Sequence, residues 1–117
     1  METITKTGKT VQSFLKALND EDFKGARECL NDNLKFIGVM GTRDGGDVYI
    51  ADMEKMKFKY DIKKIFEDGN DVSVFYDINM GGTTIFSSGW YQLSGGKISL
   101  IKVIFDPRPL LEKSDKK

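Results

Sequence analysis

The sequence predicts one α+β domain in which helices cover one face of a mostly antiparallel sheet. Three observations lead to this prediction: helical periodicity in the first half of the chain, apolar–polar alternation in the second half, and glycine pairs between the alternating runs. The 117 residues suffice for one core, and no repeat or composition shift divides them. We therefore expect a single domain over 1–117, with a flexible lysine-rich tail over about 112–117.

The first half predicts three helices. The first ends near Asn19 and has apolar residues at i, i+3, i+4 and i+7, which are Val11, Phe14, Leu15 and Leu18. The acidic run 20–22 caps a second helix, because carboxylates are favoured at the positive end of a helix dipole. The apolar face of this second helix is Phe23, Ala26 and Leu30.

A short strand over 34–37 and a turn-rich segment over 41–47 come next. Asp47 is the expected N-cap of a third helix, whose apolar residues are Tyr49, Met53 and Met56. From residue 57 the period changes to two, and four long strands follow as a meander over 57–67, 72–80, 84–93 and 97–106. The glycine pairs 81–82 and 95–96 mark hairpin turns, since glycine adopts positive φ without strain.

Composition excludes several classes of function. Lysine plus arginine and aspartate plus glutamate both number 18, so we expect neither a nucleic-acid nor a membrane partner, which would require a positive field. The lone cysteine, Cys29, fits a reducing compartment, and no apolar run reaches a membrane span, so we expect a cytoplasmic protein. The chain has no histidine, which excludes Ser-His and Cys-His catalysis and removes the commonest metal ligand. We expect no metal and no cofactor.

The order of these elements, and the turns and helix starts between them, resemble those of the nuclear-transport-factor-like superfamily and, within it, the SnoaL-like proteins. The resemblance rests on the opening helix 11–19, the acidic start Asp22-Phe23, the turn Gly95-Gly96-Lys97-Ile98 and the closing run 104–107. It implies three N-terminal helices on a curved sheet that forms a cone with an internal pocket. Members of this superfamily isomerise steroids, cyclise polyketides, dehydrate, open epoxides or simply bind, so the fold does not decide the function.

The resemblance also tests particular chemistries. Aligned with ketosteroid isomerases, the three chemical positions fall on Phe14, Gly38 and Gly89, and none of these side chains can carry a proton or stabilise an oxyanion. Cyclase-like and dehydratase-like members use histidine, which is absent here. An Arg-Asp pair like that of epoxide hydrolases would use Arg43 with Asp44 or Asp47; the alternative is that these residues only form a turn and a helix cap.

Side-chain alternation in the register implied by the family predicts the pocket lining. The expected ligand-binding residues are aromatic: Phe36, Tyr60, Tyr76, Tyr91 and Phe105. The alternative is that these rings fill the cone and leave no void. Asp106, at the end of the last strand, is the candidate general base if burial beside Phe105 raises its pKa. The alternatives for Asp106 are an ion pair with Arg108 or a turn at the Asp-Pro step.

The same alternation leaves apolar residues on the outer face of the sheet, where no helix covers them. They are Phe75, Phe86, Trp90, Leu100 and Ile104, and Ile98 is expected beside them. A patch of this kind predicts a homodimer interface, and SnoaL-like proteins commonly pair sheet to sheet. The competing expectation is that the tail or the loop around Arg43 folds over the patch.

Three hypotheses for function remain. The first is a non-catalytic or weakly catalytic SnoaL-like protein that binds a small apolar or aromatic molecule in its cone. The second is an enzyme of the cyclase, isomerase or lyase kind that uses Asp106 and the pocket tyrosines. The third is a dimeric protein-interaction module. A dry aromatic void favours binding, a polar void with a perturbed carboxylate favours catalysis, and a filled cone favours interaction.

Overall fold

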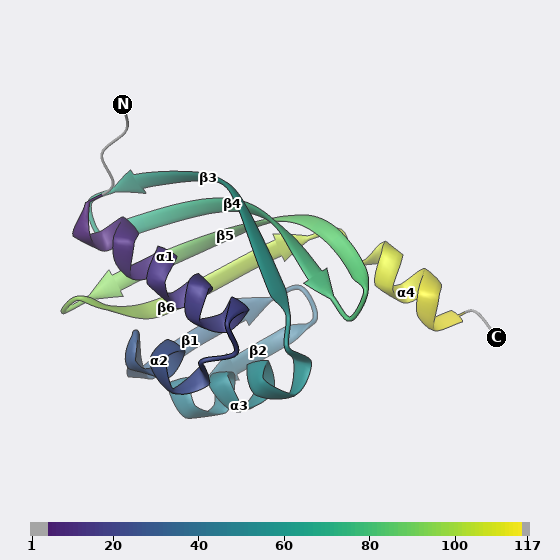
Figure 1. The fold of residues 1–117 in the computed structure, drawn as a ribbon, viewed down its shortest axis with the longest axis horizontal. Helices are drawn as coiled ribbons and strands as arrows, with labels where there is room; N and C mark the ends of the chain where they lie inside the picture. Colours follow the sequence, from purple (N-terminus) through teal and green to yellow (C-terminus); the bar gives the residue numbers. More distant parts are fainter. Residues whose placement is uncertain (1–4, 116–117) are drawn as a thin grey trace.

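Four helices and one six-stranded sheet form residues 5–115, the part of the chain that this computed structural model describes (Figure 1). The helices are α1 (Lys6–Asn19), α2 (Phe23–Glu28), α3 (Gly46–Met56) and α4 (Arg108–Asp115). The strands are β1 (Leu30–Gly38), β2 (Gly41–Asp44), β3 (Lys59–Asp68), β4 (Asp71–Met80), β5 (Thr83–Ser94) and β6 (Lys97–Phe105). The predicted α+β class and the three N-terminal helices are confirmed.

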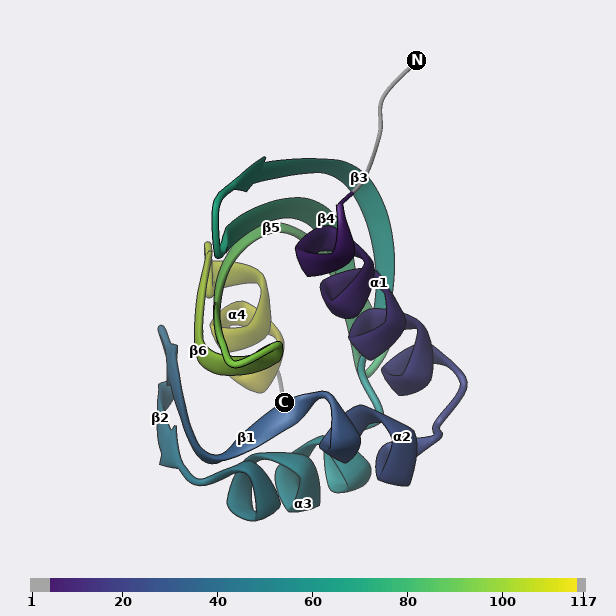
Figure 2. The same cartoon turned by 90° about the vertical axis from the view of Figure 1, so that its left-hand side faces the viewer.

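The sheet has the order β2-β1-β6-β5-β4-β3, and every pairing is antiparallel except that of β1 with β6. It curls around α1 without closing, so that β2 and β3 remain as its two edges (Figure 2). α1 packs against β3 and β4, whereas α3 packs against β1 and β2. The concave side of the sheet therefore holds the core, and its convex side has no helix from α1 to α3.

The core forms where the apolar face of α1 meets the inward residues of the strands. The four apolar residues predicted for the first helix, Val11, Phe14, Leu15 and Leu18, are at most 2% exposed. β4 and β5 bury every second residue, as a sheet with one covered face requires. Ile98 differs from the prediction: a bulge between Gln92 and Leu93 shifts the β5–β6 register and turns Ile98 into the core.

Several boundaries differ from the sequence prediction. α2 ends at Glu28, and Leu30 begins β1 instead of completing the helix. The segment expected to be only a turn contains β2, which pairs with β1 in a hairpin. The N-cap of α3 is Gly45, with φ of 102°, and Asp47 lies in the first turn of the helix. Glycine suits this cap because other residues rarely adopt that φ.

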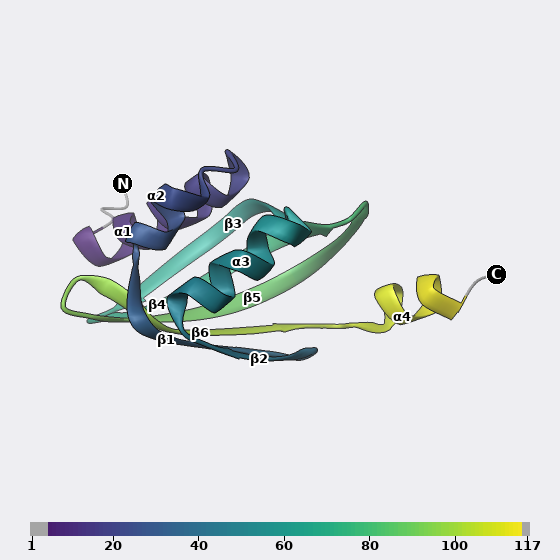
Figure 3. The same cartoon turned by 90° about the horizontal axis from the view of Figure 1, so that it is seen from below.

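α4 was not predicted. It occupies most of the segment expected to be a tail and stands beyond the end of β6, apart from the other helices (Figures 1 and 3). Pro109 is the second residue of α4, where the missing N–H has no intrahelical partner to lose. Residues 116 and 117 lie outside the described residues. Within residues 5–115, no helix is long and apolar enough to cross a membrane.

Candidate functional site

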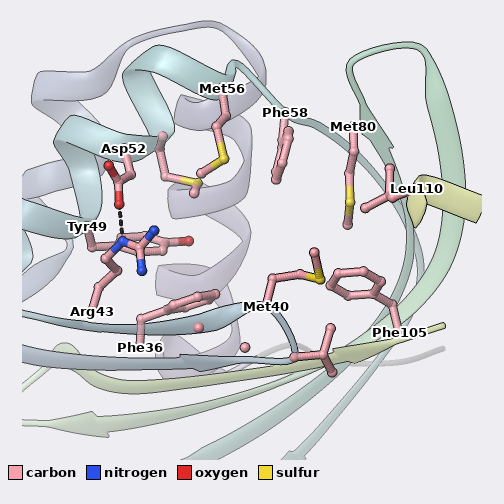
Figure 4. A pocket seen from close by; sticks show the side chains of 14 residues that line it. Phe36, Met40, Arg43, Tyr49, Asp52, Met56, Phe58, Met80, Phe105 and Leu110 are labelled. Carbon is pink, nitrogen blue, oxygen red and sulfur yellow. Dashed lines mark hydrogen bonds and ion pairs between the residues drawn. The ribbon is translucent and has the colours of Figure 1, made fainter. Parts of the chain in front are cut away.

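A cavity of about 280 Å³ opens between α3, the β1–β2 hairpin and the ends of β4 and β6 (Figure 4). Its lining is mainly apolar: Phe36, Gly38, Val39, Met40, Gly41, Arg43, Tyr49, Asp52, Met53, Met56, Phe58, Met80, Phe105 and Leu110. Leu110 comes from α4, so the unpredicted helix supplies part of the wall. The cavity thus lies between elements that are far apart in the sequence.

Methionines form much of this lining. Met40 comes from the hairpin turn, Met53 and Met56 from α3, and Met80 from the end of β4. The chain has five methionines, and the fifth, Met1, lies outside the described residues. Methionine side chains are unbranched and polarisable, so they adapt to apolar molecules of different shape. Methionine-rich surfaces are typical of sites that bind partners of varied shape.

Two charged residues face the cavity, Arg43 on β2 and Asp52 on α3. The Arg43 Nε donates a hydrogen bond to the Asp52 carboxylate, and Arg43 Nη1 donates to the carbonyl of Thr42 at 2.7 Å. Their side chains are 41% and 26% exposed, so water reaches the pair. Figure 4 shows the guanidinium projecting into the cavity beside Tyr49 and Phe36.

All four tyrosines of the chain have their rings on the inner side of the sheet. Tyr76 and Tyr91 share a hydrogen bond of 2.7 Å between their hydroxyls, and the Tyr60 hydroxyl lies 3.7 Å from the Met53 sulfur. Burial raises the pKa of Tyr60 and Tyr76 and raises the pKa of Tyr49 and Tyr91 well above the ordinary value. Near neutral pH these phenols are therefore hydrogen-bond donors and not bases.

The five predicted ligand-binding residues divide into two groups. Phe36 and Phe105 line the cavity. Tyr60, Tyr76 and Tyr91 point inward but do not line it. The Phe14 ring of α1 packs against Tyr91, and Met53 of α3 lies against the Tyr60 hydroxyl. Tyr76 and Tyr91 are at most 1% exposed. The interior around these tyrosines is thus filled by side chains, and the cavity lies beside it, lined by Phe36 and Phe105.

Asp106 does not have the raised pKa expected of a general base. Its carboxylate accepts hydrogen bonds from the Arg108 guanidinium, the shortest at 2.7 Å, and from the Arg108 backbone N–H at 3.0 Å. These bonds lower the pKa of Asp106 to about 2. Asp106 is also exposed and outside the cavity lining. The ion pair with Arg108, one of the two alternatives considered from the sequence, is the arrangement found.

The Arg-Asp pairs considered from the sequence, Arg43 with Asp44 or Asp47, are not formed. Asp47 binds Arg27 at 2.6 Å, outside the cavity, and Asp44 is exposed at the end of β2. Arg43 pairs instead with Asp52, which sequence reasoning missed. A signal was available, because the cavity-lining residues of α3 have helical spacing, i, i+3, i+4 and i+7: Tyr49, Asp52, Met53 and Met56.

Phe14, Gly38 and Gly89 occupy different environments. Phe14 is fully buried in α1, with its ring centroid 6.3 Å from those of Tyr49 and Tyr91. Gly38 lines the cavity, and Gly89 lies under the Tyr76 ring. No group of three or more metal-ligating side chains occurs within the described part of the chain.

The residues predicted for a dimer interface lie on the convex face of the sheet. Phe86, Trp90 and Ile104 are 60%, 41% and 65% exposed, while Phe75 and Leu100 are half-buried. The Phe75 ring lies between those of Phe66 and Phe86, with centroids 6.0 and 6.1 Å away. Arg43 points into the cavity, so its loop does not cover this face.

The chain matches no protein-family model, and no curated protein matches it. Among solved structures, it is 52% identical to an NTF2-like protein of unknown function from Cytophaga hutchinsonii, with a TM-score of 0.90, over 95% of this chain and 99% of that one. An LEH-like epoxide hydrolase from M. tuberculosis is 24% identical, with a TM-score of 0.80 over 92% and 87% of the two chains. TerC, co-crystallised with polyporic acid, is 16% identical, with a TM-score of 0.80 over 92% and 97%. The last two likenesses show the fold alone.

Proposed function

Since this chain belongs to the NTF2-like proteins, we propose that it is a SnoaL-like binding protein for a small, mostly apolar molecule in the methionine-lined cavity. The observation that carries the proposal is the cavity itself, about 280 Å³ with fourteen lining residues of which two are charged. Ligand pockets are typically apolar clefts with a few polar groups, of about 300–1,000 Å³. A cavity of about 150 Å³ holds benzene, so this one suits a body of about two fused rings.

Binding is favoured over catalysis by the protonation states around the cavity. Its tyrosine is a protonated phenol, and Asp106 is outside it with a lowered pKa. Asp52 is the one carboxylate among the described residues of the lining, and Arg43 already holds it. Phe14, Gly38 and Gly89 supply no proton carrier. TerC, which shares the fold, was co-crystallised with a small organic molecule, polyporic acid.

A second candidate is the hydrolysis of a small epoxide, and the Arg43–Asp52 pair is the observation that favours it. Asp52 would take a proton from water as the water oxygen attacks a ring carbon and the C–O bond breaks. Arg43 would donate a hydrogen bond to the departing epoxide oxygen, which finally takes a proton from solvent. The described lining offers no second carboxyl group to act as the acid, so we rank this candidate below binding. Diol formation from styrene oxide that Asp52→Asn abolishes would reverse the ranking.

The proposal is tested by NMR of protein labelled with ¹³C at the methionine methyl groups. Naphthalene should shift the resonances of Met40, Met53, Met56 and Met80, because all four line the cavity. Met56→Trp places a ring at the wall and should weaken binding at least about tenfold, since overlap with a packed group costs on the order of 1–3 kcal/mol. Val48→Trp, on an exposed position of the same helix, is the matched control. A wild-type spectrum that naphthalene leaves unchanged contradicts the proposal.

A further inference from the structure

We propose that the ligand of this cavity carries an uncharged carbonyl group, which accepts a hydrogen bond from the Arg43 guanidinium. This inference rests on the proposed function and names the chemical class that the site selects. The apolar wall accounts for binding of a hydrocarbon body, but it does not account for a guanidinium that projects into the cavity (Figure 4). The guanidinium fixes what the polar end of the ligand must be.

Arg43 has more N–H donors than its two hydrogen bonds use. A guanidinium carries five N–H groups and no acceptor. Nε is bonded to Asp52 and Nη1 to the carbonyl of Thr42, and the described residues supply no other hydrogen-bond acceptor to Arg43. The remaining N–H groups lie beside Phe36 and Tyr49, whose rings cannot accept a strong hydrogen bond. A ligand with an oxygen acceptor at this end of the cavity would satisfy them.

The guanidinium is also held in place. Asp52 fixes its orientation from α3, and the Thr42 carbonyl fixes it from β2 itself. A donor that is already oriented loses little conformational entropy when a ligand binds. Arg43 therefore acts as a preformed anchor at one end of the apolar wall.

The charge of the pair decides between a carbonyl and a carboxylate. Arg43 and Asp52 are the charged residues of the described lining, and their charges cancel. A carboxylate would add an unbalanced negative charge to a pair that is already neutral, close to the Asp52 carboxylate, which is unfavourable. A carbonyl oxygen accepts the same hydrogen bond and adds no charge.

The test compares three probes of one size: naphthalene, 2-acetylnaphthalene and 2-naphthoate. The methionine methyl resonances measure each affinity, so occupancy is read in the same way for all three. In wild type, 2-acetylnaphthalene should bind at least about tenfold more tightly than naphthalene, because a hydrogen bond to a charged group is stronger than one between neutral groups. 2-Naphthoate should bind less tightly than the ketone.

The decisive variant is the double substitution Arg43→Met/Asp52→Asn, which removes both charges and leaves no charge unpaired. Its preference for the ketone over naphthalene should fall to about onefold, while naphthalene itself still binds and shows that the cavity is intact. Lys16→Met/Asp20→Asn removes an exposed ion pair at the C-terminal end of α1 and should keep the wild-type preference.

Each contrary result has its own meaning. If naphthalene and the ketone bind wild type equally, the carbonyl inference is wrong and the binding function stands. If 2-naphthoate binds most tightly, the polar end is an anion and the inference is likewise overturned. If none of the three shifts the methionine methyl groups, the proposed function itself fails.

Discussion

Gly89 lies in β5 directly beneath the paired phenols of Tyr76 and Tyr91. A Cβ at this position would come within 2.8 Å of the Tyr91 ring, and the Tyr76 hydroxyl would be closer still. The absence of a side chain is therefore what allows the two hydroxyls to meet in the core. This glycine is required for close packing and not for an unusual φ.

We expect Gly89→Ala to lower the free energy of unfolding by about 1–3 kcal/mol, because an inserted methyl group forces buried neighbours to shift. The same substitution in a Tyr76→Phe background should cost less, since the hydroxyl that the methyl group meets is gone. Urea denaturation of the four proteins in this cycle measures the difference. Equal costs in both backgrounds would show that the Tyr76 hydroxyl does not set the requirement for glycine.

The tyrosines also show what alternation predicts and what it does not. Period-two patterning places alternate residues of a strand on one face, and the register implied by the family correctly predicts that Tyr76 and Tyr91 face the concave side. Alternation gives no position along the cone axis. Whether an inward ring borders a void depends on what packs opposite it, and here the Phe14 ring of α1 packs against Tyr91, with centroids 6.3 Å apart.

At the scale of the elements, the N-terminus of α1 is capped from a distant strand. The Glu67 carboxylate of β3 accepts hydrogen bonds from the Thr5 hydroxyl and from the backbone N–H groups of Thr5 and Gly8, at 3.1 and 2.9 Å. The two backbone N–H groups are donors that the first turn of a helix leaves without intrahelical partners. The cap therefore joins the first helix to an edge of the sheet.

The Thr5 and Gly8 donors lower the pKa of Glu67 below its ordinary value of 4.5. A carboxyl whose pKa is lower in the folded state stabilises the fold above the unfolded pKa, and this contribution is lost as pH falls through the folded pKa. Glu67→Gln should therefore be less stable than wild type at pH 7, with a difference that shrinks below about pH 4.5. Urea denaturation between pH 3 and pH 7 measures this, with exposed Glu54→Gln as the control. A difference that does not change with pH would contradict the capping role.

The elements that were not predicted from the sequence are those without a regular pattern of apolar and polar residues. β2 has four residues between two glycine-containing turns, which is too short for alternation to appear. α4 begins between two prolines, Pro107 and Pro109, which locally resemble a turn. The parallel pairing of β1 with β6 joins strands far apart in sequence, and no local pattern contains that information. Each of the three borders the cavity or positions its wall, so the void was harder to predict than the fold.

At the scale of the whole molecule, the convex face of the sheet presents large apolar side chains that no described helix covers. Phe86, Trp90 and Ile104 are each at least 41% exposed. Phe66 is a fourth large apolar residue on this face, and it is 53% exposed. Lys102 lies 5.5 Å above the Trp90 ring, and Asp71 accepts a hydrogen bond from its indole N–H at 2.9 Å. Monomeric proteins seldom expose contiguous patches of this kind. We propose that two copies pair through this face.

Sedimentation at micromolar concentration should find wild type as a dimer that buries on the order of 800 Å² per chain. Trp90→Glu should give a monomer, because a carboxylate would replace the central ring and lie near Asp71. Ile104→Lys tests the same face without disturbing that hydrogen bond, and Ser13→Glu, exposed on α1, is the control. A wild-type monomer under these conditions rules the dimer out.

The parallel β1–β6 ladder has a consequence for how the chain reaches its native state. Phe36 pairs with Ile101, so β1 acquires its inner neighbour only when a strand from the far end of the chain arrives. Closing so long a loop is entropically costly, and proteins rich in such distant pairings fold slowly. During synthesis, the first half can form its helices and the β1–β2 hairpin, but β1 keeps an open edge until residues 97–105 have left the ribosome. Until then, the nascent chain exposes an unpaired edge of β1 beside the future cavity.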